Sequence, residues 1–287
     1  MTTQREKWDV LKILNWTKGY LAEKGVENPR LEAEWMLCEA LSLDRVGLYL
    51  NFDKPLNDSE LAAFRGMVAR RGRREPLQYI LGSQEFMGLD FQVTPAVLIP
   101  RHDTEVLVTE AVKRGAGLRS ILDIGTGSGC VAIAIALSLP EAEVLSVDIS
   151  GEALEVARGN AERNGVTVQF FQGSLFDPFN GRRFDMIVSN PPYIPAAEIA
   201  TLQQEVRGFE PLGALDGGTD GLDFYRGIVS GAAEHVNLGG WLLFEVGAGQ
   251  APQVLELLRN AGFSVDCFTQ TDPSGIERVV GGRLAND

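Results

Sequence analysis

The turn Asn190-Pro191-Pro192-Tyr193, which follows the apolar run FDMIVS, carries the residues best suited to chemistry. Proline fixes φ and has no backbone donor, so two successive prolines make a rigid turn that is rich in free acceptors. The Asn190 side-chain oxygen and the Pro191 carbonyl, whose direction Pro192 restricts, can accept both hydrogens of a planar NH₂ group. Tyr193 can lie flat against that group and exclude water. We expect these four residues to bind an amino group; the alternative is that the prolines simply end a strand.

The expected chemistry is methyl transfer. A conjugated NH₂ group is a weak nucleophile because its lone pair is delocalised. Two acceptors aimed at its hydrogens turn the lone pair toward an electrophilic carbon, so Asn190, Pro191 and Tyr193 are the predicted catalytic residues. No strong base is needed beforehand, since the nitrogen becomes acidic as it gains the methyl group. S-adenosylmethionine fits as the cofactor, because its sulfonium is a good leaving group and it carries a ribose.

A glycine-rich loop, DIGTGSG, follows the apolar run at 120–124 and is a candidate cofactor site. Glycines let a backbone approach a ligand closely, and the next helix presents its N-terminal N–H groups. Asp148, 23 positions after Gly125, can accept from both hydroxyls of a ribose, although a helix cap is the alternative role and Ser150 could supply it. The expected cofactor contacts in these two loops are Gly125, Thr126, Gly127, Ser128, Gly129 and Asp148.

A sheet must bring these loops to one edge. The expected strands are 120–124, 143–148, 166–171, 183–188, 241–246, 263–269 and 277–282. They alternate with helical stretches such as 130–138, 151–165 and 250–262, which indicates an α/β fold with a mostly parallel sheet. The last two strands have no helix between them and are expected to form an antiparallel edge hairpin. In such sheets ligands bind at the carboxyl ends of the strands, where the loops above are found.

The part before the sheet has a different character. Residues 1–80 contain no strand signal and predict a small helical domain with helices near 8–25, 29–41 and 57–72. Residues 81–98 predict a β-hairpin linker with a turn at Gly88, and residues 99–287 form the expected catalytic domain. The arginine-rich run at 70–74 is expected to be a solvated edge of the helical domain, with a partner contact as the alternative.

Composition places the chain among globular proteins. It has 287 residues, 45% of them hydrophobic and 23% charged, and no apolar run long enough for a membrane helix. The start, MTTQREKWDV, lacks a signal pattern, so we expect a cytoplasmic protein. We also expect a monomer. Cys38, Cys130 and Cys267 are expected to be unpaired core residues, and only two histidines are present, so no metal site is expected.

Charge bears on the substrate. Residues 1–80 carry 13 Lys and Arg against 12 Asp and Glu, whereas the remaining 207 residues carry 13 against 27. An acidic catalytic domain disfavours DNA, which calls for clustered positive charge. A nucleic-acid methyltransferase acting on the amino group of adenine or guanine nevertheless stays open as the alternative. A nicotinamide dehydrogenase would have no use for Asn190 and Tyr193, and a non-catalytic binding module would need no intact acceptor turn.

Motifs along the chain resemble those of one family, the release factor glutamine methyltransferases of the HemK/PrmC type. They are EPLQYILGSQEFMG, VLIPRHDTEVLV, DIGTGSGCVAIAIA, SNPPYIP, FEPLGALDGGTDGLDFYR and the closing ERVV. The resemblance implies a Rossmann-like, seven-stranded methyltransferase domain that uses S-adenosylmethionine, with the strand order 3-2-1-4-5-7-6. It adds Ser174, Leu175 and Asn190 to the expected cofactor contacts.

The resemblance also implies a substrate, the side-chain amide of the glutamine in the Gly-Gly-Gln motif of peptide chain release factors. Such a modification tunes translation termination. A primary carboxamide is a planar, conjugated NH₂ group of the kind that the turn is expected to bind. In the family, the helical domain and the hairpin help to recognise the protein substrate.

Some residues depart from the family pattern or invite a second role. His102 and Asp103 stand where proline and glutamate are expected, which should make that loop less rigid. Ser174 stands where an acid often precedes the adenine contact, and a hydroxyl accepts more weakly than a carboxylate. Glu245, an acid at the end of a strand, is expected to be structural, with a place in the lining of the cofactor or substrate cleft as the alternative. Asp216 is expected to serve a turn rather than catalysis. Phe86 is expected to pack within the hairpin, with a substrate contact as the alternative.

Overall fold

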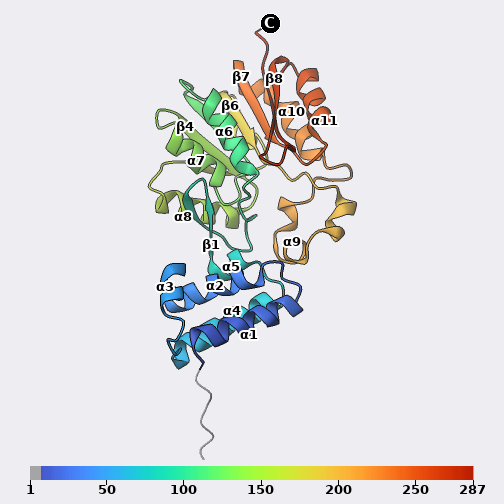
Figure 1. Ribbon diagram of the computed structural model, residues 1–287. Helices are drawn as coiled ribbons and strands as arrows, with labels where there is room; N and C mark the ends of the chain where they lie inside the picture. Colours follow the sequence, from blue (N-terminus) through green and yellow to red (C-terminus); the bar gives the residue numbers. More distant parts are fainter. Residues whose placement is uncertain (1–7, 287) are drawn as a thin grey trace, which may run out of the picture. The chain divides into compact units, whose positions relative to one another are not determined.

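The chain forms two compact units, seen in the ribbon of the computed structural model (Figure 1). The structure describes residues 8–286, so the expectation that residues 1–7 carry no signal pattern lies outside the described residues. The helical unit contains the chain up to Gly82 together with Gln203–Phe209. The catalytic unit contains Ser83–Leu202 and the chain from Glu210 onward. No sequence pattern indicates that the short segment at 203–209 joins the helical unit.

The helical unit confirms the three expected helices and adds three shorter ones. Its helices are α1 (Val10–Glu23), α2 (Pro29–Leu41), α3 (Arg45–Leu50), α4 (Asp58–Gly72), α5 (Leu77–Leu81) and α9 (Gln204–Phe209). The α1 helix begins later than expected, because Asp9 caps it by accepting the Lys12 N–H at 2.9 Å, so Trp8 precedes the helix. At α4, Asn57 and Glu60 form a reciprocal capping box. Local capping chemistry thus defines these helix starts.

The arginine run does not form the solvated edge that its charge predicts. Arg71 is only 4% exposed, and its guanidinium pairs with Glu32 and, at 3.0 Å, with Glu205. Arg74 pairs with the other oxygen of Glu205 at 2.7 Å, whereas Arg73 is exposed. The prediction is wrong because the acidic partners lie far away in the sequence. The arginines instead hold segment 203–209 within the helical unit.

The catalytic unit is built on a seven-stranded sheet with the expected order. The strands are β3 (Ser120–Ile124), β4 (Glu143–Asp148), β5 (Gln169–Gln172), β6 (Phe184–Ser189), β7 (Val236–Glu245), β8 (Val265–Thr271) and β9 (Glu277–Arg283). They lie in the order β5-β4-β3-β6-β7-β9-β8, which is 3-2-1-4-5-7-6 counted along the chain. The antiparallel edge is also confirmed, since β9 pairs antiparallel with both β7 and β8. This order makes β3 and β6 neighbours, so the loops that follow them lie side by side.

Helices cover both faces of this sheet (Figure 1). Helices α6 (Thr104–Arg114), α7 (Cys130–Ser138) and α8 (Gly151–Arg163) pack on one face, and α10 (Asp223–His235) and α11 (Ala251–Asn260) on the other. Side chains alternate between the two cores, with Ile121 and Val144 in one and Leu122 and Leu145 in the other. Among the described residues, no helix is both long and apolar enough to cross a bilayer.

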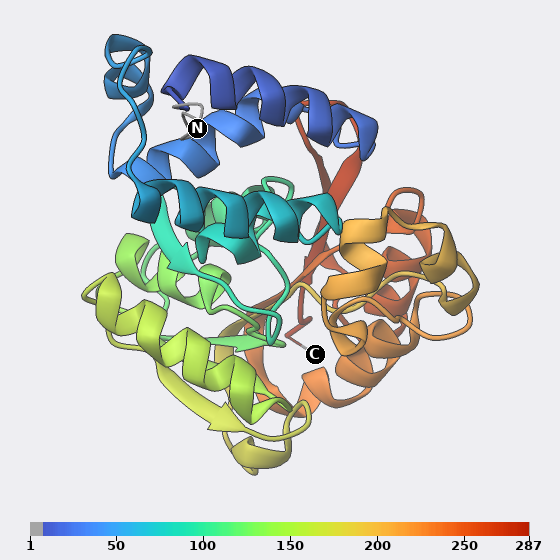
Figure 2. The ribbon, with the colours of Figure 1, turned by 90° about the horizontal axis from the view of Figure 1, so that it is seen from below.

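The hairpin of β1 (Ser83–Phe86) and β2 (Leu89–Gln92) belongs to the catalytic unit. Its two-residue turn, Met87-Gly88, has φ of 54° and 76°, which favours glycine and confirms the expected turn at Gly88. Phe86 is fully buried and meets Phe91 edge-on at 6.0 Å, so its expected role in hairpin packing is confirmed. Asn160 of α8 exchanges hydrogen bonds of 2.7 and 3.0 Å with the backbone of Gln92. In Figure 2 the blue-green hairpin lies beside the green helices.

The cysteines are unpaired, as expected. Cys38 and Cys130 are buried, and Cys267 is partly buried and donates to the Phe263 carbonyl at 3.2 Å. Short 3₁₀ helices occupy three loops near the sheet, at Asp177–Phe179, Ala196–Thr201 and Leu212–Ala214. The last two segments lie beyond the Asn190-Tyr193 turn in the sequence, and Gly213 and Ala214 of the last one line the cavity described next.

Candidate active site

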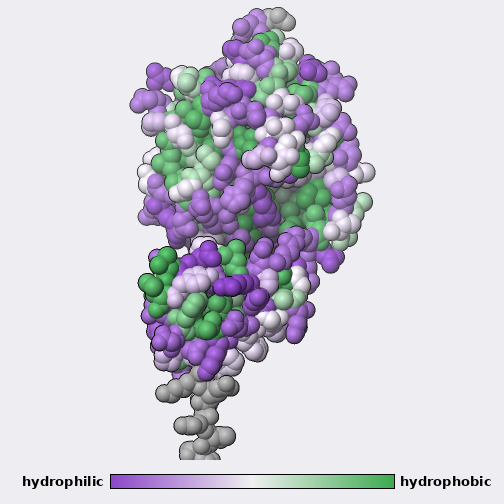
Figure 3. Space-filling view, viewed as in Figure 1, coloured by the Kyte–Doolittle hydropathy of each residue, from purple (hydrophilic) through white to green (hydrophobic). Residues whose placement is uncertain are grey.

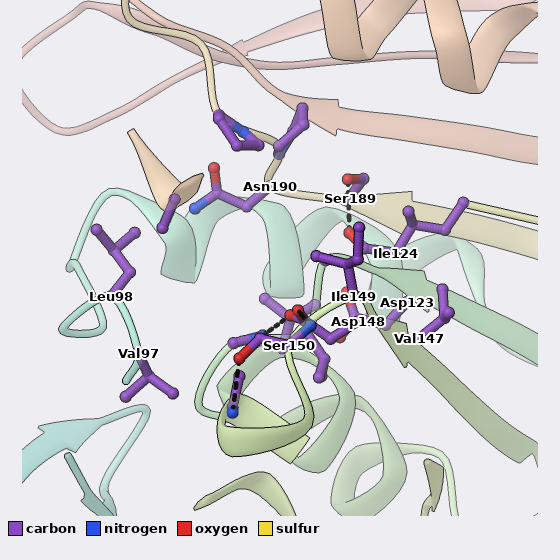
Figure 4. A pocket seen from close by; sticks show the side chains of 18 of the residues that line it. Val97, Leu98, Asp123, Ile124, Val147, Asp148, Ile149, Ser150, Ser189 and Asn190 are labelled. Atoms are coloured by element: carbon purple, nitrogen blue, oxygen red, sulfur yellow. Dashed lines mark hydrogen bonds between the residues drawn. The ribbon is translucent and has the colours of Figure 1, made fainter. Parts of the chain in front are cut away.

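A cavity of about 370 Å³ opens where β3, β4 and β6 end (Figure 4). Ten of the twelve predicted site residues line it, from the loops after four strands: Gly125, Thr126, Gly127, Ser128, Asp148, Ser174, Leu175, Asn190, Pro191 and Pro192. Figure 4 shows Asn190 on one side of the cavity and Asp148, Ile149 and Ser150 on another, with Val97 and Leu98 at a third. The structure thus brings the predicted cofactor loops and the acceptor turn into one space.

Two predicted residues, Gly129 and Tyr193, lie behind the walls of the cavity rather than on them. Gly129 caps α7 with φ of 83°, and a Cβ there would lie 3.0 Å from Ile133 and 3.1 Å from Ala157. Its lack of a side chain therefore lets α7 and α8 pack closely. The Tyr193 hydroxyl lies 3.5 Å from Glu245, and burial raises the pKa of this phenol. Sequence spacing alone does not separate such supporting positions from lining positions.

Asp148 joins two of the loops that line the cavity. One carboxylate oxygen accepts the Gly127 N–H and the other accepts the Ser150 N–H, each at 2.9 Å. The cap of α8 is instead Ser150, whose hydroxyl accepts the Ala153 N–H at 3.1 Å. The alternative role of Asp148 as the helix cap is therefore excluded. Since a carboxylate has about four lone-pair sites, both oxygens keep capacity to accept hydroxyl groups.

The glycine loop has the features that a nucleoside cofactor needs. Gly125 and Gly127 have φ of 79° and 53°, and a Cβ at either would meet no atom within 4 Å, so the space beside the backbone is open. The Thr126 hydroxyl is buried and makes no hydrogen bond of standard geometry among the described residues, although it is close enough to Asp123 to lower the pKa of that acid. Ile149, next to Asp148, lines the cavity although it is 75% exposed. A buried hydroxyl, an acid and an exposed apolar side chain together fit the ribose and base of S-adenosylmethionine.

The Asn190 carboxamide has a defined orientation. Its Nδ2 donates to the Thr104 hydroxyl oxygen at 3.1 Å. This bond uses the nitrogen, and none of the hydrogen bonds formed by the described residues involves Asn190 Oδ1 or the Pro191 carbonyl. Ser189, just before, anchors the turn to β3 by donating to the Ile124 carbonyl at 2.7 Å. Two acceptors are therefore left free on a turn that is fixed to the sheet.

The segment ALDGGTDG supports the back of this turn. The Ile194 N–H donates to the Leu215 carbonyl at 3.1 Å, and the Gly217 N–H donates back to the Ile194 carbonyl at 2.9 Å. A Cβ at Gly221, where φ is 77°, would lie 2.3 Å from the Tyr193 carbonyl oxygen. This close approach requires glycine, so the motif's glycines serve the turn.

Two further side chains fix this region. Gln250 donates to the Tyr193 carbonyl at 2.9 Å and accepts the Gly247 N–H at 2.9 Å. Asp216 accepts the Gly218 N–H at 2.9 Å, which confirms its expected turn role. The Tyr193 backbone is thus restrained from both sides of the turn.

The loop with the altered motif is tied down by ion pairs. Arg101 pairs with the buried Glu210 at 2.5 Å, and Glu210 also accepts the Ile99 N–H at 3.2 Å. Asp103 pairs with Arg278 of β9 at 2.8 Å. These contacts hold the residues on both sides of His102, the position where the family pattern has proline. Ion pairs of the side chains therefore restrain a loop whose backbone no proline restricts.

Two buried acids at the strand ends have raised pKa values. Asp123 is 1% exposed, and burial raises its pKa to about 6, partly offset by a hydrogen bond from Ser146. Glu245 is also 1% exposed, and burial raises its pKa to about 7. Asp123 lines the cavity, and Glu245 lies behind the acceptor turn beside Tyr193. Both were missed as site residues, and the sequence signal for each is an acid at the end of an otherwise apolar strand.

Solved structures with a similar fold are methyltransferases. A methyltransferase from Pyrococcus furiosus aligns with a TM-score of 0.55 at 22% identity, covering 76% of this chain and 98% of that one. The catalytic domain of hMettl16, in complex with MAT2A 3'UTR hairpin 6, aligns with a TM-score of 0.55 at 18% identity, covering 77% of this chain and 83% of that one. At these identities the similarity shows the fold alone.

Sequence comparison identifies the family. Residues 12–82 match the model for the PrmC N-terminal domain, and residues 102–206 match the methyltransferase small domain. A release factor glutamine methyltransferase of Geobacter sulfurreducens is 63% identical over 99% of this chain and 100% of its own length. Another, of Moorella thermoacetica, is 47% identical over 84% and 87%. The chain therefore belongs to the release factor glutamine methyltransferase family.

Proposed function

We propose that this protein transfers a methyl group from S-adenosylmethionine to the side-chain amide nitrogen of the Gly-Gly-Gln glutamine of peptide chain release factors. The names of its relatives support this substrate. The observation that carries the proposal is the orientation of Asn190, whose Nδ2 is engaged by Thr104 so that Oδ1 is free beside the free Pro191 carbonyl. Because release factors act on ribosomes, the proposed location is the cytoplasm.

Residues of the glycine loop would hold the cofactor. Asp148 would accept the ribose hydroxyls, the buried Thr126 hydroxyl would gain a hydrogen bond, and Ile149 would pack against the base. Ser174 and Leu175 line the same cavity and would contact the base at its edge. When bound, S-adenosylmethionine supplies an electrophilic methyl group on a positively charged sulfur.

The turn would hold the substrate. Asn190 Oδ1 and the Pro191 carbonyl accept the two N–H bonds of the glutamine amide, which turns its nitrogen lone pair toward the methyl group. The contribution is mainly one of positioning, since the amide nitrogen loses a proton only after it gains the methyl group. Tyr193, packed behind the turn, fixes the turn's backbone and limits the entry of water.

A protein substrate suits the charge of the catalytic unit better than a nucleic acid does. This unit, residues 83–202 and 210–287, carries 26 acidic side chains against 12 basic ones. An acidic surface repels the phosphate backbone of a nucleic acid and attracts a basic protein domain. Release factors contact ribosomal RNA, so we expect them to present such a basic domain. The structural similarity to an RNA-bound methyltransferase catalytic domain does not favour a nucleic acid, because it extends only to the fold.

We also propose that the helical unit recognises the release factor. Large apolar side chains are exposed on α2 and α3, with Trp35 at 45%, Val46 at 66% and Leu50 at 79%. Figure 3 shows hydrophobic residues gathered on the visible face of this unit. Exposed apolar patches of this kind mark sites of protein association.

The first test is a methyl-transfer assay with labelled S-adenosylmethionine. Label should appear on purified release factor, at the Gly-Gly-Gln peptide, and not on tRNA or DNA. Asn190→Ala should abolish transfer while cofactor binding by calorimetry persists, and the exposed Asn180→Ala should leave the rate unchanged. Label on a nucleic acid alone, or an active Asn190→Ala variant, would contradict the proposal.

The second test separates recognition from chemistry. Leu50→Ala should raise KM for intact release factor severalfold without changing kcat or the rate on a short Gly-Gly-Gln peptide. Leu238→Ala, which removes an apolar side chain with 64% exposure from β7, is the matched control and should leave KM as it is. Equal effects of the two variants on KM would contradict the proposal that the helical unit recognises the release factor.

A further inference from the structure

A buried carboxyl group stands behind the acceptor turn and meets it at the Tyr193 hydroxyl. Glu245 ends β7 and is 1% exposed, so its carboxyl group has left bulk water. The Tyr193 hydroxyl lies 3.5 Å from its Oε1, and its Oε2 has no hydrogen bond of standard geometry among the described residues. The Thr104 hydroxyl also stabilises this carboxylate and lowers its pKa. Such an acid is costly to bury, so a purely structural role explains it poorly.

Thr104 connects Glu245 to Asn190. It is the first residue of α6 and is 2% exposed, and its hydroxyl oxygen accepts the Asn190 Nδ2–H at 3.1 Å. A hydroxyl has a single proton to donate, so once its oxygen accepts from Asn190 that proton needs an acceptor of its own. No hydrogen bond of standard geometry joins Thr104 to Glu245 among the described residues. We infer that the Glu245 carboxylate is this acceptor, because both side chains are buried and the Thr104 hydroxyl lowers the pKa of Glu245.

The direction of the hydrogen bonds from Asn190 through Thr104 to Glu245 determines whether the substrate meets the oxygen or the nitrogen of the Asn190 carboxamide. With Glu245 ionised, the carboxylate can only accept, so Thr104 donates to it and Asn190 must donate to Thr104. Asn190 Oδ1 then faces the substrate amide. A neutral carboxyl group can also donate, so Thr104 can turn its proton toward Asn190. The carboxamide can then flip and present two N–H donors to an amide that also offers donors, and this arrangement cannot bind the substrate.

We propose that Glu245 and Thr104 are positioning residues: the ionised carboxylate draws the Thr104 proton, holds Asn190 with Oδ1 toward the substrate and receives the Tyr193 hydroxyl. The inference deepens the proposed function, on which it rests, because it assigns a control of the acceptor pair to a group that touches neither substrate nor cofactor. It makes methyl transfer depend on the protonation of one internal acid.

Neighbouring groups set the pH range of this control. The groups that act on Glu245, from several elements and including those that its charge affects, are Asp103, Thr104, Cys130, Tyr193, Tyr225 and Arg278. Burial is the largest cause and raises the pKa of Glu245, Asp103 raises it further, and Arg278 lowers it, leaving a pKa of about 7. The ionised, active form therefore predominates above this pH and is lost below it.

The test is the pH dependence of the methyl-transfer rate at saturating cofactor and release factor, from pH 5.5 to 8.5. The wild-type rate should fall below about pH 7, and E245Q, which has no proton to gain, should lack this fall. Because both enzymes use the same substrate, any titration of the release factor cancels in the comparison. T104V should be slower by roughly ten- to a hundredfold, as expected for a misplaced reacting group. T104S, which restores the hydroxyl, should recover most of the rate.

Two further measurements keep the outcomes separate. Calorimetry should give the same S-adenosylmethionine affinity for T104V and the wild type, which shows that the variant is folded. Carbon-13 NMR of the glutamate carboxyl groups should show one signal that titrates near pH 7 and is absent from E245Q. An acidic fall that persists in E245Q, a flat wild-type profile, or a T104V rate equal to the wild type would overturn the inference. Failure of the proposed function has a different signature, an inactive wild-type enzyme or an active N190A.

Discussion

The buried Glu245 should cost the protein stability at the pH where it is active. Burial moves its pKa from 4.5 to about 7. Between these two values the folded state keeps a proton that the unfolded state has released, so stability falls as pH rises through this window and stays low above it. A shift from 4.5 to about 7, at ~1.4 kcal/mol per pKa unit, corresponds to about 3 kcal/mol at pH 8.

The variant E245Q removes this cost while keeping the shape of the side chain. Urea unfolding of E245Q and the wild type should coincide at pH 4.5, where the carboxyl group is neutral in the folded state. At pH 8, E245Q should be more stable by about 3 kcal/mol, which moves the urea midpoint by roughly 1 M at a slope of about 3 kcal/mol per M. The gain should accompany the changed pH profile of activity, so that one substitution stabilises the fold and removes the pH control.

Glu256 supplies the matched control. It lies on α11 and is exposed, so E256Q removes a carboxylate without a burial cost. At pH 8 its stability should differ from that of the wild type by much less than the difference expected for E245Q. A pH-independent difference for E245Q, or a wild type that is the more stable protein at pH 8, would show that Glu245 is ionised at little cost and would refute the reasoning.

Three further predictions concern the cofactor loop, the turn and the helical unit. D148N should weaken S-adenosylmethionine binding in calorimetry by roughly ten- to a hundredfold, because the ribose hydroxyls lose their hydrogen bonds to a charged carboxylate. The control E152Q, at an exposed position, should bind the cofactor as the wild type does. G221A should lower kcat by up to about a hundredfold, because its Cβ displaces the catalytic turn, while G159A, in an open helical position, should keep the wild-type rate. R71M leaves the partly buried Glu32 without its guanidinium partner and leaves Glu205 with Arg74 alone, and it should lower the urea stability of the helical unit by about 3 kcal/mol; a loss below about 1 kcal/mol would contradict this role.

The parts of the fold that rest on local pattern were predictable. The alternation of strands and helices, the Asn28-Pro29 start of α2 and the turn at Gly88 depend on residues close in sequence, and the structure confirms them. Boundaries were less accurate: β7 begins at Val236 rather than 241, since pairing with β6 continues across a bulge that no local signal marks. The strand order came from the family resemblance rather than from the residues themselves.

The site could be predicted only as far as each loop carries its own signal. Asp148 and the glycine loop stand directly after strands, so their meeting in one cavity follows from a parallel sheet. Thr104 and Glu245 lie 86 and 55 positions from Asn190 in the sequence, and only the folded chain brings them to it. The prediction of a solvated arginine run is wrong for the same reason, because a count of charges does not reveal that Glu205 neutralises Arg71 and Arg74.

The membership of segment 203–209 in the helical unit bears on how the protein can be dissected. The segment is flanked on both sides by catalytic chain, so the polypeptide passes between the two units three times rather than once. Deletion of residues 1–82 removes Arg71 and Arg74 but keeps Glu205, which then lacks the two guanidinium groups that neutralise it. This stranded acid lies in the stretch that begins ten residues after Tyr193. A deletion of the N-terminal helices therefore also alters the segment that follows the catalytic turn. Cutting the coding sequence at one position does not separate the two units, because residues 203–209 belong to the helical unit.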